Sequence, residues 1–187
     1  MCAPRTPFAR GRARILGAVL AGGRSRRFGS DKAFALLDGR PLIAHAASAL
    51  GALTGQVVIC GHDFPPFETL ADLPEPDMGP LGGLNAALAH ARLKGFDGVL
   101  STGCDMPVLP ADVAAALIGD EAAVVEGQHL IGWWPAALAP MLDAHLRTTR
   151  DRSMRGWFAL VGPRLVRGPA LPNINTPADL RAWEDDR

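Results

Sequence analysis

The apolar positions of this chain fall into short continuous runs that alternate with longer segments of helical periodicity. The run at Gln56–Cys60 (QVVIC) has the length and β-branched content of a buried strand, whereas PLIAHAASAL has the pattern of a helix. By these criteria we predict strands over 15–20, 56–60, 96–102, 122–126 and 130–135, and helices over 41–50, 81–93, 110–118, 137–148 and 177–185.

Strands and helices alternate through most of the chain, which predicts a parallel sheet covered by helices on both faces. The pattern loosens after residue 118, and the segment 62–80, with five prolines, is the least regular part of the interior. We therefore expect one α/β domain over 15–187, a three-layer sandwich around a mostly parallel sheet.

Composition narrows the kind of partner that this domain can have. At 187 residues and 48% hydrophobic content the chain can bury one core. The 19 basic and 19 acidic residues leave no net field to attract nucleic acid or an anionic membrane, so neither is expected as a partner. Cys2, Cys60 and Cys104 have no CxxC spacing, which argues against a disulfide framework or a zinc ribbon and favours a reducing, cytoplasmic location.

The first fourteen residues contain four arginines and no acid. A secretory signal is not favoured, because the apolar run that follows, ILGAVLA, is only seven residues long and contains a glycine. No segment reaches the roughly 18 uncharged apolar residues of a membrane span. We expect residues 1–14 to be a disordered basic tail, or the result of an upstream start codon, rather than a functional arm.

The segment LAGGRSRRFGSDK, residues 20–32, follows the first predicted strand and is rich in glycine and positive charge. Gly22 and Gly23 let backbone amides approach an anion closely, while Arg24 and Lys32 supply charge around it. The spacing fits neither a Walker loop nor a dinucleotide fingerprint. The pattern indicates a triphosphate site of another kind, and the alternative is an arginine-rich surface turn.

Ligands of open α/β sheets gather at the carboxyl ends of the strands, where Asp105 follows the third predicted strand in STGCDMP. One such carboxylate facing a bound triphosphate is suited to Mg²⁺, which takes few protein ligands and fills its shell with phosphate oxygens and water. The alternative for Asp105, taken alone, is a turn residue or a helix cap.

Two further segments carry candidate recognition residues. Asp77 begins DMGPLGGLN and is placed to accept hydrogen bonds from a base or a ribose, although a solvated turn would explain it too. Asn173 and Asn175 alternate along NINTPADL, so both amides lie on one face of an extended stretch, where their donors and acceptors could read the edge of a heterocyclic ligand. Helix capping explains the TPADL part.

Four motifs, LAGG with DK, GPLGG, CDMP and NINTPADL, resemble those of nucleotidyltransferases, and most closely the molybdenum cofactor guanylyltransferases. The resemblance implies a Rossmann-like nucleotidyltransferase fold of the nucleotide-diphospho-sugar transferase type. It implies transfer of GMP from GTP to the terminal phosphate of molybdopterin carrying molybdenum, with Mg²⁺ as cofactor. By the same resemblance, the catalytic residues are Lys32 and Asp105, the metal ligand is Asp105, the nucleotide-binding residues are Leu20, Ala21, Gly22, Gly23, Arg24, Lys32, Asp77 and Asp105, and the substrate-binding residues are Asn173 and Asn175.

The resemblance also allows transient contact with other molybdenum cofactor biosynthesis proteins. One departure stands out, because Cys60 occupies a position where these enzymes often carry asparagine. Two alternatives stay open: a nucleotidyltransferase that uses CTP or another acceptor such as a sugar phosphate, and a catalytically silent nucleotide-binding scaffold. The presence of Lys32 and Asp105 together argues against the scaffold, since binding alone does not require a metal carboxylate.

Overall fold

The computed structural model describes residues 13–22, 31–169, 173–174 and 176–185. Its strands are β1 (Ile15–Leu20), β2 (Leu36–Leu37), β3 (Arg40–Pro41), β4 (Gln56–Cys60), β5 (Glu68–Leu70), β6 (Gly98–Gly103), β7 (Ala123–Val125), β8 (Gln128–Pro135) and β9 (Arg164–Val166). Its helices are α1 (Leu42–Gly51), α2 (Gly79–Lys94), α3 (Ala111–Leu117), α4 (Ala139–Thr148), α5 (Met154–Val161) and α6 (Pro177–Asp185), with short 3₁₀ turns η2 (Lys32–Phe34) and η3 (Ala136–Leu138).

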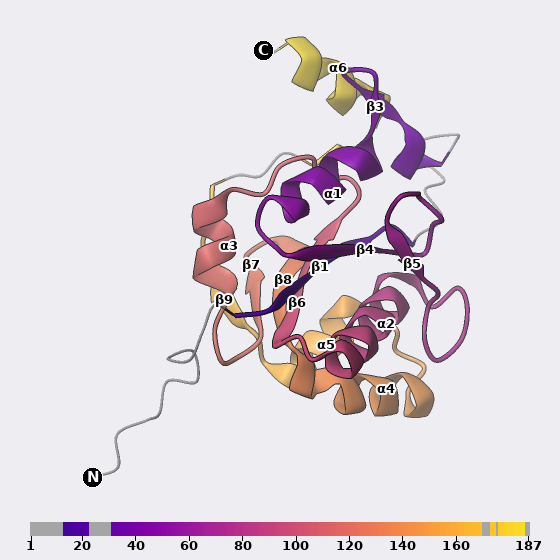
Figure 1. Ribbon diagram of the computed structural model, residues 1–187, viewed down its shortest axis with the longest axis vertical. Helices are drawn as coiled ribbons and strands as arrows, with labels where there is room; N and C mark the ends of the chain where they lie inside the picture. Colours follow the sequence, from indigo (N-terminus) through magenta and orange to yellow (C-terminus); the bar gives the residue numbers. More distant parts are fainter. Residues whose placement is uncertain (1–12, 23–30, 170–172, 175, 186–187) are drawn as a thin grey trace.

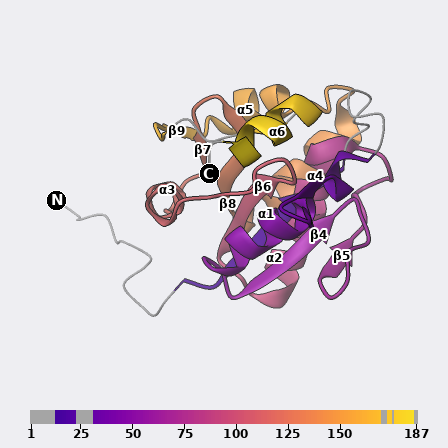
Figure 2. The ribbon, with the colours of Figure 1, turned by 90° about the horizontal axis from the view of Figure 1, so that it is seen from above.

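Seven of the strands form one mixed sheet in the order β5-β4-β1-β6-β8-β7-β9, with the edge strands β5 and β9 on opposite sides of the molecule (Figure 2). The pairs β5–β4, β4–β1, β1–β6 and β7–β9 are parallel, while β8 runs antiparallel to both of its neighbours. The sequence prediction of a mostly parallel sheet is confirmed. The long runs of β1 and β6 are buried along nearly their whole length, as expected for strands covered on both faces.

Helices cover both faces of the sheet, which confirms the predicted three layers. Figure 1 shows α1 and α3 on one side of the strands and α2, α4 and α5 on the other. A hydrophobic core lies on each face of the sheet. Consecutive side chains of β8 point to opposite faces: Trp133 packs into the core under α1 and α3, and Trp134 packs into the core under α2, α4 and α5. Both indoles are fully buried, and each donates from Nε1, Trp133 to the Gly119 carbonyl and Trp134 to the Ser101 hydroxyl.

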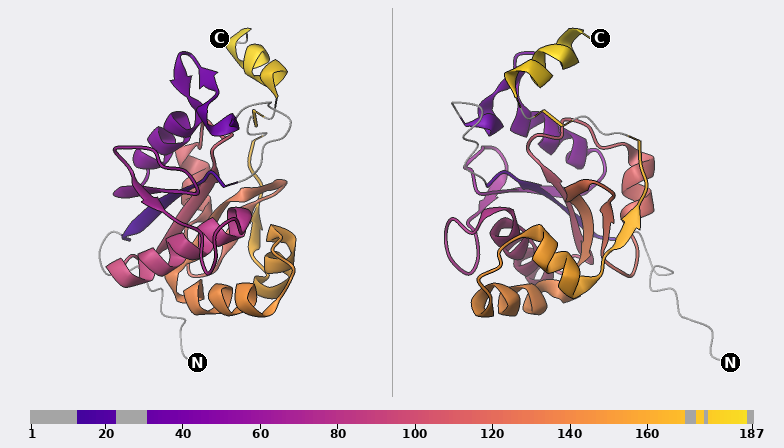
Figure 3. Two further views of the ribbon diagram at one scale, coloured as in Figure 1. Left: turned by 90° about the vertical axis from the view of Figure 1, so that its right-hand side faces the viewer. Right: turned by 180° about the vertical axis from the view of Figure 1, so that it is seen from behind.

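A small third cluster lies outside these layers. Leu37 of the β2–β3 hairpin and Leu42 pack with Ile174, and Trp183 of α6 lies against them. Figure 3 shows α6 beside the hairpin at one end of the molecule. Reciprocal bonds start α6, because the amide of Asp179 donates to the Thr176 hydroxyl (3.2 Å) and the amide of Thr176 donates to the Asp179 carboxylate (2.8 Å), as the capping prediction required.

Several elements were not predicted. The strands β2, β3, β5 and β9 have only two or three residues each, too few for a periodic signal, and β5 lies inside the proline-rich segment. The helix α5 is missing from the prediction although Ser153 caps it, its hydroxyl accepting from the Gly156 amide at 3.0 Å.

The N-terminal boundary also differs from expectation at one residue. Arg14, assigned to the tail, donates from its amide to the Asp97 carboxylate (2.7 Å) and lies over the ring of Phe96. Residues 1–12 of the predicted tail lie outside the described residues. In the described part of the chain, no helix is both long and apolar enough to cross a membrane.

Candidate active site

The LAGG motif, residues 20–23, is called the glycine turn below, and it begins where β1 and β4 end side by side. Leu20 and Ala21 are buried, and the amide of Ala21 donates to the carbonyl of Cys60 at 2.9 Å. Gly61 has φ +93°, and a Cβ there would lie 2.8 Å from the backbone of Gly22. Only glycine permits this close approach of the two chain segments. Leu20, Ala21 and Gly22 thus lie at the carboxyl edge of the sheet, as predicted, while Gly23, Arg24 and Asn175 lie outside the described residues.

Lys32 and Asp105 meet at this edge although 73 residues separate them. Nζ of Lys32 lies 3.0 Å from Oδ2 of Asp105, and the two side chains are only 9% and 18% exposed. Burying an ammonium group in this way requires a charge partner, which Asp105 supplies. The neighbouring Gly103 leaves room for the carboxylate, because a Cβ at Gly103 would occupy its place. The structure brings the two residues together, and their catalytic role stays a prediction.

The carboxylate of Asp105 has the chemistry of a ligand for a hard metal ion. Among the described residues, no group of three or more His, Cys, Asp or Glu side chains could hold a metal ion as a closed protein cage. A single hard carboxylate oxygen beside a phosphate site is nevertheless the arrangement in which Mg²⁺ is usually bound, with phosphate oxygens and water completing its shell. The residues present therefore fit a metal that arrives with the nucleotide.

A second carboxylate, Asp72, lies at the same edge and was missed by sequence reasoning. Its Oδ2 accepts from the Met78 amide at 3.0 Å, and its Oδ1 is buried with no hydrogen-bond partner among the described residues. Burial raises the pKa of Asp72 and the charge of Asp77 adds to this, while the amides of Met78 and Gly79 act in the opposite direction. A buried oxygen without a donor marks a place where a ligand donor can bind.

The surroundings of Asp72 locate it between the glycine turn and the start of α2. A Cβ on Gly83 would lie 3.6 Å from its Oδ1, and one on Gly22 would lie 4.0 Å away. A Cβ on Gly82 would come within 3.1 Å of the Asp72 side chain. The signal that could have identified Asp72 is the strand-end rule, since it lies two residues after β5, but β5 itself was not predicted.

Asp77, the predicted nucleotide contact, is exposed and adopts a left-handed conformation with φ +59°. It lies two residues before α2, and within the described part of the chain it makes no hydrogen bond or ion pair. Its role in binding stays a prediction from the sequence.

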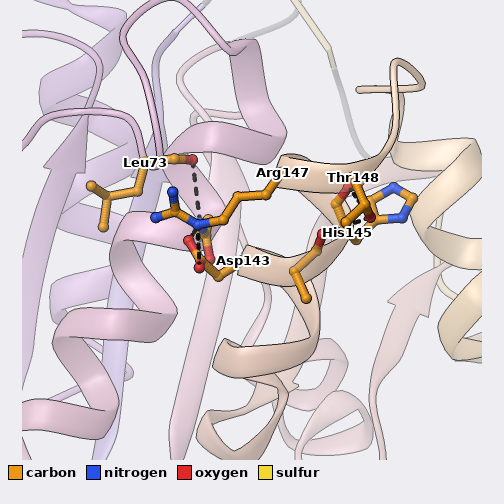
Figure 4. Close-up of polar contacts among 7 residues, drawn as sticks. Leu73, Asp143, His145, Arg147 and Thr148 are labelled. Atoms are coloured by element: carbon orange, nitrogen blue, oxygen red, sulfur yellow. Dashed lines mark hydrogen bonds and ion pairs between the residues drawn. The ribbon is translucent and has the colours of Figure 1, made fainter.

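The loop that carries Asp72 is tied to α4 by a polar network (Figure 4). The amide group of Asn85 donates to the Leu73 carbonyl (3.3 Å) and to Oδ1 of Asp143 (3.2 Å), and Nε of Arg147 donates to Oδ2 of Asp143 at 2.7 Å. Hydrogen bonding from Arg147 lowers the pKa of Asp143, so the carboxylate stays ionised. The network fixes the backbone next to Asp72 without using Asp72 itself.

The C-terminal motif reaches the site through its backbone. The amide of Ile174 donates to the Asp105 carbonyl at 3.1 Å, and Ile174 itself is buried. Oδ1 of the neighbouring Asn173 is buried with no hydrogen-bond partner among the described residues. The structure therefore brings Asn173 to the Asp105 loop, and its contact with a substrate stays a prediction.

The surroundings of the two described cysteines disfavour their thiolate forms. Burial raises the pKa of both Cys60 and Cys104 to about 12, with the charge of Asp72 adding to this at Cys60 and that of Asp105 at Cys104. Both are free thiols that stay protonated near neutral pH.

The Lys32–Asp105 pair lies at the carboxyl edge of a mostly parallel sheet, and solved structures of other proteins share this α/β fold. Molybdopterin-guanine dinucleotide biosynthesis protein A from Archaeoglobus fulgidus has a TM-score of 0.69 at 22% identity, covering 92% of this chain and 97% of that one. The 2-C-methyl-D-erythritol 4-phosphate cytidylyltransferase from Thermus thermophilus has a TM-score of 0.67 at 18% identity, covering 91% and 96%.

Sequence similarity identifies the family. The family model described as MobA-like NTP transferase domain matches residues 17–166. A molybdenum cofactor guanylyltransferase of Rhizobium leguminosarum bv. trifolii is 34% identical over 96% of this chain and 96% of its own length. This chain belongs to the MobA-like NTP transferase family.

Proposed function

We propose that this protein is a molybdenum cofactor guanylyltransferase, which transfers GMP from GTP to the terminal phosphate of molybdopterin carrying molybdenum. The products are molybdopterin guanine dinucleotide and pyrophosphate. Family membership and the relatives' activity support this assignment. The single structural observation that carries it is the largely buried Lys32–Asp105 pair at the carboxyl edge of the sheet, beside the glycine turn.

The physical problem of this reaction is charge repulsion. An oxygen of the acceptor phosphate forms a bond to the α-phosphorus of GTP, and the bond from that phosphorus to the bridging oxygen of the leaving pyrophosphate breaks. In this proposal, Lys32 neutralises phosphate charge, and backbone amides of the LAGG motif donate to phosphate oxygens. No covalent enzyme intermediate is needed, which agrees with the protonated cysteines.

Mg²⁺ is the cofactor that the carboxylate chemistry fits best. Asp105 would hold it, and a bound Mg²⁺ would supply positive charge to the phosphates and the leaving group. Lys32 then has two roles, because it offsets the charge of Asp105 when no nucleotide is present and faces the phosphates when one is bound.

In this proposal, the nucleoside and the pterin are recognised by side-chain oxygens that have no hydrogen-bond partner among the described residues. The unpaired Oδ1 of Asp72 can accept from a base N–H or a ribose hydroxyl, and Oδ1 of Asn173 can accept from the second substrate or from guanine. Asp77 and Asn175 keep the binding roles that the sequence predicts for them. Cys60, where related enzymes often carry asparagine, is buried behind the glycine turn and offers no equivalent amide.

A cytidylyltransferase shares the fold, so the fold alone does not determine the base. The preference for GTP over CTP is therefore part of the proposal. The cellular setting follows from the substrates: we expect a cytoplasmic enzyme that receives its pterin from other molybdenum cofactor biosynthesis proteins in transient contact. Free thiols at Cys60 and Cys104 are compatible with a reducing compartment.

Transfer of label tests the reaction directly. GTP labelled at the α-phosphate is incubated with the protein, Mg²⁺ and molybdopterin carrying molybdenum, and the pterin product is isolated. We expect the label to appear in the pterin product, and label placed at the γ-phosphate to appear in pyrophosphate. Transfer of label from CTP to the pterin would support the same reaction with a different base. Absence of transfer from both GTP and CTP would refute the proposed function.

A further inference from the structure

His62 follows β4 directly and contacts the segment that carries Lys32. Its Nε2 lies 2.6 Å from Oδ2 of Asp31, and its ring stacks on that of Phe34 with centroids 5.7 Å apart and planes 11° from parallel. Nδ1 of His62 lies against the carbonyl of Gly61, which fixes the rotation of the ring and directs Nε2 toward Asp31. The side chain is 19% exposed, so this arrangement is partly shielded from water.

Both partners of His62 flank Lys32 in the short turn η2. Asp31 is the N-cap of η2, and its Oδ1 accepts from the Ala33 amide at 3.1 Å while its Oδ2 faces His62. Phe34 is the last residue of η2. His62 therefore holds the turn at both ends, and the lysine lies between the two contacts.

A three-residue turn has little stability of its own, so outside contacts must fix its position. The core side is anchored by Ala33, which is buried under α1. The outer side is held by His62, because Phe34 is 44% exposed and packs against the His62 and Phe64 rings. Lysine has a long, flexible side chain, so the placement of its ammonium group depends on where the backbone of η2 lies.

We propose that His62 is a positioning residue for Lys32, holding η2 through Asp31 and Phe34 so that the Lys32 ammonium meets Asp105 and the nucleotide phosphates. His62 acts through the lysine and touches no substrate. The inference rests on the proposed role of Lys32 in phosphate binding.

Equilibrium binding of GTP, titrated into the millimolar range with Mg²⁺, tests this coupling in a double-mutant cycle of His62→Phe and Lys32→Ala. Phenylalanine keeps the stack on Phe34 and removes the contact with Asp31. We expect His62→Phe to weaken GTP binding about fivefold, within the range for the loss of one hydrogen bond. In the Lys32→Ala background the same change should have an effect below about 1.5-fold, because the residue on which it acts is gone.

Two further variants separate positioning from general stability. His62→Arg supplies both a hydrogen-bond donor for Asp31 and a flat group for Phe34, and should recover most of the lost affinity. Arg167→Gln removes an exposed ion pair with Glu126 beside β9, and should leave GTP binding unchanged.

The outcomes separate this inference from the proposed function. If Lys32→Ala binds GTP as the wild type does, the phosphate role of Lys32 is wrong and the proposed function loses its main structural support. If Lys32→Ala weakens binding but His62→Phe does not, or if His62→Phe weakens it equally in both backgrounds, His62 does not act through Lys32 and the inference is overturned.

Discussion

Asp105 and Asp72 are two partly buried carboxylates that follow parallel strands of one sheet, and they are stabilised in different ways. Asp105 is paired with an ammonium group at 3.0 Å. Asp72 accepts at Oδ2 from the Met78 amide and makes no ion pair with a described residue, and burial raises its pKa. A carboxylate next to a cation suits a site for phosphate and metal, whereas one with an unsatisfied oxygen suits a site for neutral donors.

This difference divides the proposed active site into two regions. In the proposed function, the region of Lys32 and Asp105 manages the charge of the reacting phosphates. The region of Asp72, at the start of α2, is proposed to recognise the nucleoside. Substitutions in the first region should therefore affect chemistry most, and substitutions in the second should affect binding most.

Asp105→Ala has the largest expected effect. We expect turnover to fall by on the order of a thousandfold, because the carboxylate and its metal act mainly in the transition state. GTP affinity should change by less than about tenfold. Single-turnover kinetics with separately measured GTP dissociation constants give both quantities, and equal losses in the two would refute the catalytic role.

Lys32→Ala should impair both quantities, each by about ten- to a hundredfold, since its charge faces the nucleotide before and during the reaction. Lys32→Arg is the matched control, which keeps the charge and should recover part of the binding. Wild-type binding and rate in Lys32→Ala would show that the glycine turn and lysine do not form the triphosphate site.

Asp72→Asn should weaken GTP binding by about tenfold with little change in the single-turnover rate at saturation, because a charged acceptor of a nucleoside hydrogen bond is lost. The matched variant is Asp77→Asn, which removes an acid from the same loop. We expect a smaller loss there, because Asp77 is exposed. A larger loss of GTP affinity in Asp77→Asn would show that Asp77, as the sequence predicts, and not Asp72 contacts the nucleoside.

The smallest effect concerns stability. Since burial raises the pKa of Asp72 above its ordinary value of 3.8, the folded state binds more protons than the unfolded state between those two pKa values. Its contribution to stability is therefore most favourable below the ordinary carboxyl pKa and is lost as the pH rises through the raised one.

Asp72→Asn removes this ionisation and should raise the melting temperature at pH 7 by no more than about 2 °C, a small shift for a chain of this size. The gain should be smaller near pH 4, because Asp72 of the wild type becomes more protonated as the pH falls. Calorimetry of both proteins at pH 7 and pH 4 measures the difference in melting temperature. A gain that is larger at pH 4 than at pH 7 would contradict the raised pKa of Asp72.

The parts of the molecule with long periodic segments could be predicted from the sequence. β4 and α6 begin and end where the pattern placed them, because their apolar runs and caps are local signals. The convergence of Lys32 and Asp105 was also predictable, since both follow strands that lie next to each other in the centre of the sheet.

Contacts made across short, irregular segments could not be predicted. Asp72 follows a three-residue edge strand in a proline-rich loop, so no pattern singled it out from the other acids nearby. The contact of His62 with Asp31 joins two loops 31 residues apart, and only the folded backbone brings them together. Local sequence patterns identify strand ends, but they do not show which loop side chains meet there.

The most direct test of the assignment is pyrophosphate release by the wild type and by Asp105→Asn, measured with Mg²⁺ and each of GTP, CTP, ATP and UTP. Each assay is run with and without molybdopterin carrying molybdenum. The guanylyltransferase assignment predicts release by the wild type with GTP only when the pterin is present, and near loss of that release in Asp105→Asn. Absence of release with all four nucleotides, or release that does not depend on the pterin or on Asp105, would contradict it.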